Sequence, residues 1–324
     1  MRTITYREAV REALREEMQR DERVFLLGED IGKFGGTNNV TLGLIDEFGE
    51  TRVRNTPISE SAIIGAAVGS AVTGMRPVAE IMFIDFIGVC MDQIMNQAAK
   101  LRYMTGGQVT VPLVIRTPGG GGRSSAAQHA QSLEGFFCHI PGLIVVQPAN
   151  PYDVKGLLKT AIRNDDPVVF VEHKMLYSTK GPVPEEEYTI PFGQADVKRK
   201  GRDITVVCTS RMVPFSLEAA EELVSEGVEV EVVDPMTLFP IDYDTIIESV
   251  KKTNRLLIVH EAAQRMGIGA EIAAEVTRRA FDFLDAPVER LGARNTPIPF
   301  APVLENYVLP DPTKIRAKIR SMLE

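Results

Sequence analysis

Short runs of β-branched and other apolar residues alternate with helical stretches along this 324-residue chain. Continuous apolar runs without polar alternation are typical of strands that are buried on both faces of a sheet. The helical stretches carry start signals, such as Thr5 with Glu8 three residues later, and Asn150 followed by Pro151. The alternation therefore predicts βαβ units around a parallel sheet, which is the α/β class. In the first half, the expected strands are 23–28, 76–83, 111–117, 143–147 and 167–172.

Residues 178–201 interrupt this pattern. They contain three prolines, three consecutive glutamates and a basic cluster, a composition typical of a linker. A second alternation of strands and helices follows, and a length of 324 residues suits about two domains. We therefore expect a first domain over 1–177, a linker over 178–201 and a second domain over 202–324.

The composition of the chain argues against some classes of binding partner. The chain has 36 basic and 44 acidic side chains, a net charge of −8 that does not favour nucleic acid. No apolar run reaches the roughly 18 residues that a membrane span requires. Cys90, Cys138 and Cys208 lack the spacing of a metal site, which indicates reduced thiols in a cytoplasmic protein. We expect neither a nucleic-acid nor a membrane partner.

Four consecutive glycines, Gly119 to Gly122, follow the strand expected at 111–117. Backbone without side chains lets a ligand approach closely after a parallel strand, although a flexible turn explains such glycines equally well. His129 lies seven residues further on, beyond the strand end where ligands bind in α/β sheets. A histidine in this place suits acid–base chemistry, and a structural role is the alternative. The chain has no GxGxxG, GxxxxGK[ST], HExxH or GxSxG motif.

Glu60 begins a helix rich in small residues, directly after the loop NTPIS. A carboxylate in the first turn stabilises a helix electrostatically, and this role explains Glu60 without any ligand. The alternative is a buried carboxyl group that hydrogen-bonds to a ring nitrogen of a bound molecule. The residues alone leave both interpretations open.

Several longer motifs occur in the order that one protein family shows: RVFLLGED, NTPISE, RPVAEIMFIDF, DQIMNQAAKLRYMTGG, AAQHAQS, IPGLIVVQPANPYDVKGLLKTAIRNDDPVVFVEHK and RNTPIPFAPVLENYVLP. Over nearly its whole length, the chain resembles the β subunit of the thiamine-diphosphate-dependent first component of 2-oxo acid dehydrogenase complexes. This family includes acetoin and pyruvate dehydrogenases. The resemblance implies two parallel-sheet domains, a transketolase-like pyrimidine-binding domain and a transketolase-type C-terminal domain.

The resemblance matches Glu60 to the glutamate that pairs with N1′ of the aminopyrimidine ring. A carboxyl group there favours the imino tautomer, whose nitrogen takes the C2 proton of the thiazolium. Met82 and Phe86 match positions that pack on the pyrimidine ring, and Ile58 lies beside Glu60 and is expected to do the same. Plain core packing is the alternative for Met82 and Phe86.

His129 matches the family histidine near the reacting carbon and the lipoyl entrance. There it would donate to a developing oxyanion or serve in transfer to lipoamide. The resemblance also implies a potassium site, reported for some relatives, whose ligands would be mostly backbone carbonyls. Compared with those relatives, the acid and the amide at positions 164 and 166 have exchanged places. The set of ligands is Leu113, Ala161, Ile162, Asn164 and Asp166.

A motif that holds the diphosphate and its magnesium is missing, because the chain contains no GDG sequence. The resemblance therefore implies that a separate α subunit holds magnesium and the diphosphate, and that the catalytic unit is an α2β2 heterotetramer. Residues 61–74, which we expect to form a buried helix, and 88–102 are the candidate interface. A lipoyl-bearing acyltransferase core is the further partner that the resemblance implies.

The expected substrate rests only on the resemblance to particular members of the family. Acetoin and pyruvate members share the AAQH pattern, and the stretches FIDFIGVCMDQIMNQAAKLRYMTGG and TPIPFAPVLENYVLP resemble acetoin members most. We therefore expect an oxidoreductase component that cleaves acetoin or decarboxylates pyruvate and passes the acyl group to lipoyl groups. A branched-chain 2-oxo acid dehydrogenase and a one-chain transketolase-like enzyme are alternatives. A nicotinamide-dependent dehydrogenase is a further alternative, but the chain lacks the glycine-rich motif of that class. A non-catalytic scaffold is another, and the complex that it supports would keep its activity in Glu60→Ala.

Overall fold

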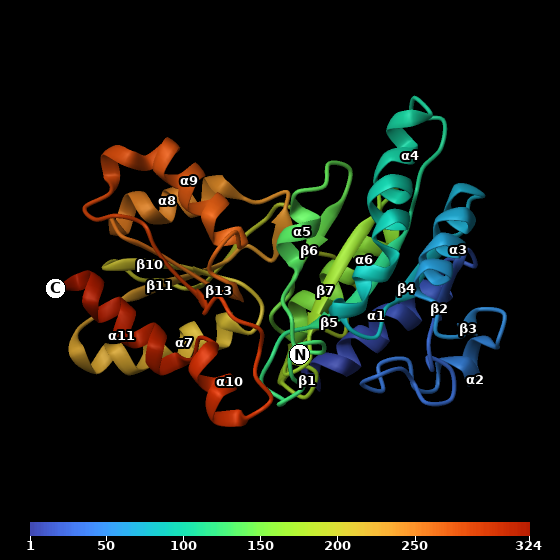
Figure 1. The fold of residues 1–324 in the computed structure, drawn as a ribbon, viewed down its shortest axis with the longest axis horizontal. Coiled ribbons are helices and arrows are strands. Elements are labelled where there is room, and N and C mark those ends of the chain that lie inside the picture. The colour runs from blue at the N-terminus through green and yellow to red at the C-terminus, as the bar shows by residue number, and fades with distance from the viewer. The chain divides into compact units, whose positions relative to one another are not determined.

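The apolar runs of the first half form one parallel sheet in the computed structural model, which describes residues 1–324. Neighbouring strands are paired in parallel, so their carboxyl ends lie at the same edge of the sheet (Figure 1). That edge is where the loops after the strands can meet a ligand. The strand order is β6 (Ile144–Val146), β7 (Val168–His173), β5 (Val114–Gly119), β4 (Arg76–Glu80), β2 (Val24–Gly28) and β3 (Val53–Asn55).

Helices of the first half pack in two groups. In one group, α1 (Tyr6–Arg20) packs against α6 (Pro151–Arg163). Both predicted start signals are confirmed, because Thr5 and Glu8 form a capping box and the Asn150 side chain accepts from the backbone of the first turn of α6. The other group comprises α3 (Glu60–Val72), the 3-10 helix η1 (Ile84–Cys90), the π-helix η2 (Gln93–Ala98) and α4 (Ala99–Met104).

Ion pairs join α1 to α6. Lys155 and Lys159 are each only 1% exposed, yet both reach Glu16, at 2.6 and 2.8 Å. Arg163 lies 2.6 Å from the fully buried Glu17. Buried charges are tolerated only when they are paired in this way. The pairs therefore fix the two helices against each other.

The second half forms another sheet, between two pairs of helices (Figure 1). On one side lie α8 (Tyr243–Thr253) and α9 (Ile268–Ala280), and on the other lie α7 (Met212–Leu223) and α11 (Pro312–Leu323). No helix of the chain has both the length and the apolar character that a membrane crossing requires. The strand order is β14 (Glu289–Ala293), β13 (Leu256–Ala263), β10 (Ile204–Cys208), β11 (Val230–Asp234) and β9 (Asp196–Arg199), of which β9 alone is antiparallel.

The chain divides into two units, and the division differs from the predicted one. Unit 1 contains residues 1–119 and 136–192, and unit 2 contains residues 120–135 and 193–324. The glycine-rich loop 120–135 therefore folds with the second half of the chain, which the sequence did not indicate. The remaining elements are α2 (Leu44–Phe48), α5 (Glu134–Cys138), η3 (Val224–Glu226), β12 (Thr237–Phe239), η4 (Phe281–Phe283) and α10 (Pro302–Val308).

The stretch predicted as a linker, 178–201, contains two strands. β8 (Lys180–Val183) pairs with β1 (Arg2–Thr5) in unit 1, and β9 pairs with β11 in unit 2. The prolines and charges that suggested a linker are also typical of short edge strands, where they block further pairing. The composition therefore could not separate the two cases.

Helix α3 differs from the fully buried helix expected over 61–74. One face carries the buried residues Ile63, Ile64, Ala67, Val68 and Ala71. The opposite face is exposed and consists of small residues, so that a Cβ added at Gly69 would meet no atom within 4 Å. The exposed members are Ser61, Ala62, Ala66 and Gly69, with the larger Val72 at the end of the helix.

Candidate active site

Polar and apolar side chains gather at the carboxyl edge of the unit 1 sheet. Glu29 directly follows β2, Met82 follows β4, and Glu60 is the first residue of α3, which follows β3. Because these strands run parallel, their following residues lie along one edge. The structure thus places two of the predicted residues, Glu60 and Met82, at the edge where a ligand is expected.

Glu29 and Glu60 form an electrostatically coupled pair of carboxyl groups. Glu29 is 7% exposed, and Glu60 is half-buried. Burial raises the pKa of Glu29, and the negative charges of Glu60 and Asp30 raise it further. The charge of the neighbouring Glu60 carboxylate thus adds to burial in disfavouring ionisation of Glu29. This arrangement suits a site that must present a carboxyl group to a ring nitrogen, and the sequence analysis missed Glu29.

The predicted apolar wall lies in the segment after β4. Met82 and Phe86 are half-buried, and neither belongs to the buried core. The Phe86 ring meets the Phe83 ring edge-to-face, with centroids 5.6 Å apart. Plain core packing therefore does not account for Met82 and Phe86. Ile58, the third predicted member, is 82% exposed.

A buried ion cluster lies behind this edge. Arg116 on β5 donates to both carboxylate oxygens of Glu172 on β7, at 2.6 and 2.9 Å, and to Glu80 on β4, at 2.8 Å. Tyr177 donates its hydroxyl to Glu172 at 2.6 Å. Burial alone would lower the pKa of Arg116, but the charges of Glu172 and Glu80 outweigh it and raise the pKa. The cluster ties three neighbouring strands together beneath the candidate site.

Sequence reasoning missed this cluster, although a signal was present. Each of its charged residues interrupts an apolar run, in RPVAE, VIRTP and VVFVE. A charge inside a strand buried on both faces needs a partner of opposite sign. Three such charges in three neighbouring strands could have suggested one shared ion cluster.

His129 lies in the loop 120–135, which belongs to unit 2. This loop begins where β5 ends, and it is closed by a hydrogen bond from the Gly120 N–H to the Gln131 carbonyl, at 2.9 Å. The imidazole is half-buried. The two predicted catalytic residues therefore belong to different units, Glu60 to unit 1 and His129 to unit 2.

Glu134 stands at the end of the same loop and is fully buried. Burial raises its pKa to about 7, against a weaker effect of its own backbone, and the charge of Glu261 raises it further. Its Oε2 atom has no hydrogen-bond partner. A carboxyl group with this pKa changes its charge near neutral pH. The sequence analysis did not single out Glu134, which lies five residues after His129.

Two of the other three histidines, His173 and His260, have structural surroundings. His260 on β13 is fully buried, and burial lowers its pKa to about 4, so the ring is neutral at neutral pH. Glycines make room for it, because a Cβ added at Gly267 would lie 2.5 Å from its Cε1 atom. His173 is 3% exposed, and its Nδ1 accepts from the Met175 N–H at 3.1 Å. These surroundings indicate a structural role for both residues.

The groups predicted to bind potassium are already engaged by other groups of the protein. Arg76 donates to the carbonyls of Ile162 and Asn164, both at 2.9 Å. The Asp166 carboxylate binds Arg102 at 2.5 Å. The other two carbonyls, of Leu113 and Ala161, accept from backbone N–H groups. No group of three or more His, Cys, Asp or Glu residues is arranged to hold a metal ion.

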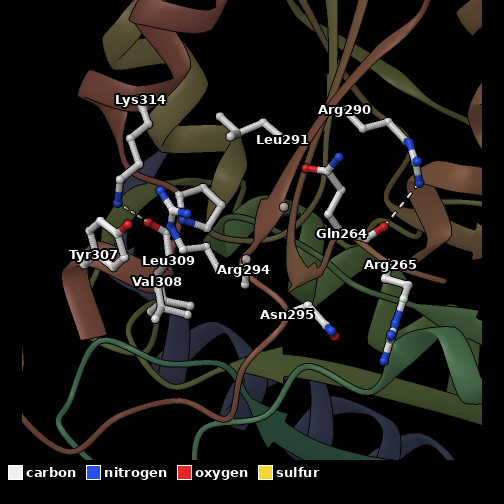
Figure 2. Close-up of a pocket in the computed structure, with 13 residues that line it drawn as sticks. Gln264, Arg265, Arg290, Leu291, Arg294, Asn295, Tyr307, Val308, Leu309 and Lys314 are labelled. Carbon is white, nitrogen blue, oxygen red and sulfur yellow. Dashed lines mark hydrogen bonds between the residues drawn. The ribbon is translucent and has the colours of Figure 1, made fainter. Parts of the chain in front are cut away.

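A pocket of about 600 Å³ lies in unit 2, and none of the predicted site residues lines it (Figure 2). Two of its four cations donate to backbone carbonyls, Arg290 to that of Gln264 at 3.2 Å and Lys314 to that of Leu309. Arg294 lies over the Tyr307 ring, 4.2 Å from its centroid. Figure 2 shows Arg290 and Lys314 on opposite sides of the pocket, so its charges do not converge on one point.

Two family models match the chain in the order of its units. "Transketolase, pyrimidine binding domain" matches residues 2–180, and "Transketolase, C-terminal domain" matches residues 193–315. The chain therefore belongs to the family of transketolase-type β subunits that includes those of acetoin and 2-oxo acid dehydrogenases. This finding confirms the resemblance and the fold class stated from the sequence.

Particular relatives are similar over almost the whole chain. The "Acetoin:2,6-dichlorophenolindophenol oxidoreductase subunit beta" of Bacillus subtilis is 51% identical and covers 97% of this chain and 95% of its own. The "2-oxoisovalerate dehydrogenase subunit beta" of the same organism is 46% identical, with 100% of both chains covered. The "Pyruvate dehydrogenase E1 component subunit beta" of Rickettsia felis is also 46% identical, with 98% of both chains covered.

One solved structure shares the fold. It is described as "Split gene transketolase, inactive beta4 tetramer", with a TM-score of 0.81 over 99% of this chain and 98% of that chain. Its sequence identity is 24%, so the similarity establishes the fold alone.

Proposed function

We propose that this chain is the β subunit of a thiamine-diphosphate-dependent oxidoreductase component that cleaves acetoin and passes the acyl group to lipoyl groups of an acyltransferase. The observation that carries the proposal is the placement of Glu60 beside Glu29 at the carboxyl edge of the pyrimidine-binding domain. The relatives named for acetoin support the substrate, at 51% and 49% identity. Pyruvate is the second candidate, because the pyruvate relatives are nearly as similar.

The residues of unit 1 fit the pyrimidine half of the cofactor. When bound, thiamine diphosphate supplies a carbon nucleophile for attack on the substrate carbonyl. Glu60 would hold a hydrogen bond to the ring nitrogen N1′, close enough to Glu29 that burial and the charge of Glu60 raise the pKa of Glu29. Met82 and Phe86 would pack on the ring and exclude water. Ile58, which is exposed in this chain, would complete the wall only against a bound ring or a partner subunit.

His129 is the proposed acid–base residue of the acyl-transfer step. A half-buried imidazole can hold a proton near the substrate oxygen and donate it as charge develops there. Its loop folds with unit 2, whereas Glu60 belongs to unit 1.

An α subunit would supply the magnesium and the diphosphate contacts in an α2β2 heterotetramer. The absence of a GDG motif supports this division of the site. The exposed small-residue face of α3 would allow another backbone to approach closely. Large apolar side chains between η1 and the end of α4 are also exposed and would be covered in such an interface, and these are Val89, Met95, Tyr103 and Met104.

Binding of a potassium ion is a further part of the proposal. The Arg76 guanidinium occupies the carbonyls of Ile162 and Asn164, so potassium could bind these oxygens only if Arg76 withdrew. In Arg76→Gln, potassium should therefore raise the melting temperature more than it does in the parent protein. Sodium at the same ionic strength is the control, and an equal response to both salts in both proteins would contradict the site. The three free cysteines support the expected cytoplasmic location.

The proposal is tested by co-expressing this chain with its α subunit and measuring reduction of an artificial electron acceptor. Acetoin, pyruvate and branched-chain 2-oxo acids are compared, with thiamine diphosphate and magnesium present. We expect the highest kcat/KM for acetoin. Glu60→Gln should lower activity by about 10²–10⁴-fold and slow C2 proton exchange of the bound cofactor by NMR.

A matched control is Glu50→Gln, because Glu50 is exposed and lies outside the site. It should leave both readouts unchanged. Unchanged C2 exchange in Glu60→Gln would contradict the catalytic role and favour the scaffold alternative. A well-formed heterotetramer without activity on any of these substrates would contradict the proposed reaction.

A further inference from the structure

Two glutamates of unit 2 that the sequence did not single out direct their carboxylates at the loop 120–135. Glu261 lies on β13 and is 7% exposed, and Glu305 lies on α10 and is 2% exposed. A buried carboxylate is costly unless hydrogen bonds or a cation satisfy it. The partners of these two carboxylates therefore indicate what they do.

Both carboxylates accept hydrogen bonds from the backbone of the loop. Glu261 Oε1 accepts from the Gly121 N–H at 2.6 Å. Glu305 accepts from two N–H groups, that of Gly122 at 2.8 Å on Oε1 and that of Ser124 at 3.0 Å on Oε2. Hydrogen bonds to ionised acceptors are roughly twice as strong as those between neutral groups. Three such bonds hold a segment of only four residues.

Two further contacts support the same segment. The Arg211 guanidinium lies 3.4 Å from the Gly121 carbonyl. Burial lowers the pKa of Arg211, and the charges of Glu261 and Glu305 oppose this effect. The side chain of Leu309 also packs on Gly121, because a Cβ added there would lie 2.6 Å from its Cδ1 atom. The segment is thus held by charge on one side and by close packing on another.

The held segment has a backbone conformation that it would not adopt alone. Gly120 and Gly122 have φ values of +86° and +96°, and the non-glycine residues Ser124 and Ala126 have values of +52° and +61°. Non-glycine residues in such regions cost about 1–3 kcal/mol each and persist only where the surroundings impose them. The surroundings that impose this conformation include Glu261 and Glu305.

We propose that Glu261 and Glu305 are positioning residues for His129: they fix the strained backbone at 121–124, and the hydrogen bond between Gly120 and Gln131 closes the loop that carries the imidazole. The inference rests on the proposed role of His129 in acyl transfer. Neither carboxylate is a catalytic residue, since each acts through the backbone of the loop.

The test uses the assembled heterotetramer and the variant Glu305→Gln. The amide keeps one acceptor oxygen, but its NH2 group faces a backbone N–H donor, so at least one of the two bonds is lost. We expect acyl transfer to lipoamide to slow about 10- to 100-fold, with a smaller effect on formation of the first covalent adduct. Amide hydrogen exchange at Gly122 and Ser124 should also accelerate.

The matched control is Glu231→Gln. Glu231 is also a buried glutamate of unit 2, 2% exposed, and it accepts from the Gly201 N–H at 3.2 Å, away from the loop. It should change global stability without changing exchange in the loop or the balance between the two chemical steps. Glu261→Gln is the second variant, in case Glu305→Gln does not assemble, with the expected exchange effect at Gly121.

A double-mutant cycle with His129→Ala separates positioning from a merely structural role. If Glu305 acts through His129, Glu305→Gln should cause no further loss of acyl transfer in the His129→Ala background. Fully additive losses, or faster loop exchange with an unchanged transfer rate, would overturn the positioning role. If His129→Ala alone changes neither chemical step, the proposed role of His129 itself is wrong, and positioning for transfer falls with it.

Discussion

The two units bury their carboxylates in different ways. In unit 1, Glu80 and Glu172 are paired with Arg116, a cation on the strand between them. In unit 2, Glu261 and Glu305 are satisfied largely by backbone N–H groups of a loop. The first arrangement holds strands of one sheet together, whereas the second sets the conformation of a segment that carries a candidate catalytic residue. The same residue type thus supports the fold in one unit and the site in the other.

The comparison predicts that removing the cation of unit 1 has the largest effect on stability. Arg116→Met leaves two buried carboxylates without their cation, and breaking such a cluster costs about 3–5 kcal/mol. Urea unfolding followed by circular dichroism should show this loss. A loss below 1 kcal/mol would mean that the carboxylates are held by something other than Arg116.

The second prediction concerns pH and unit 2. The pKa of Glu134 is raised from 4.5 to about 7, so between these values the folded state binds more protons than the unfolded state. The free energy of unfolding should therefore fall as pH rises through this window, by on the order of 3 kcal/mol in total. Glu134→Gln should remove this decline and be more stable than the parent protein at pH 8. Parallel stability profiles from pH 4.5 to 8 would contradict the burial of an ionisable group here.

A smaller effect is expected from the packing between the loop and α10. Gly121→Ala places a Cβ 2.6 Å from Leu309 Cδ1, but this methyl group is the end of a flexible side chain. The cost should be about 1 kcal/mol in thermal unfolding, and it should shrink when Gly121→Ala is made in a Leu309→Ala background, as a double-mutant cycle would show. Gly69→Ala is the control, because its Cβ meets no atom within 4 Å and alanine favours the helix. An unchanged cost of Gly121→Ala in the Leu309→Ala background would exclude this contact as the cause.

The smallest effect should come from an exposed ion pair of unit 1. Arg102 binds Asp166 at 2.5 Å, but their side chains are 47% and 40% exposed. Arg102→Met should change the free energy of unfolding by less than about 1 kcal/mol, because solvent screens exposed pairs. A difference near that of Arg116→Met would show that burial does not set the strength of these pairs.

The alternation of apolar runs and helical stretches was sufficient to predict both sheets, since buried parallel strands leave a continuous apolar signal. The capping residues Thr5 and Asn150 likewise marked two helix starts correctly, because capping depends on local sequence. Residues 88–102 of the candidate interface contain the end of the 3-10 helix η1, the π-helix η2 and most of α4, helix types that apolar periodicity does not resolve. The structure starts β5 at Val114 instead of 111 and ends it at Gly119.

The candidate site was predictable only in part. Glu60 was found at the start of its helix, and the family resemblance gave the roles of Glu60 and Met82. Glu29, Glu261 and Glu305 were not found, because their roles depend on partners 31 to 183 residues away. The loop 120–135 belongs to unit 2 because of the same long-range contacts. Local composition at Gly119–Gly122 indicated a close approach, but it could not tell whether a ligand or a carboxylate makes it.

Residues 120–135 fold with unit 2 although residues of unit 1 flank them in the sequence. This arrangement has a consequence for recombination among relatives. An exchange of gene segments at the boundary between Phe192 and Gly193 would separate Gly121, Gly122 and Ser124 from the two glutamates that hold them. A chimera should therefore inherit residues 120–135 together with residues 193–324, as one non-contiguous block. The unit of inheritance in this chain is thus set by hydrogen bonds and not by the order of its residues.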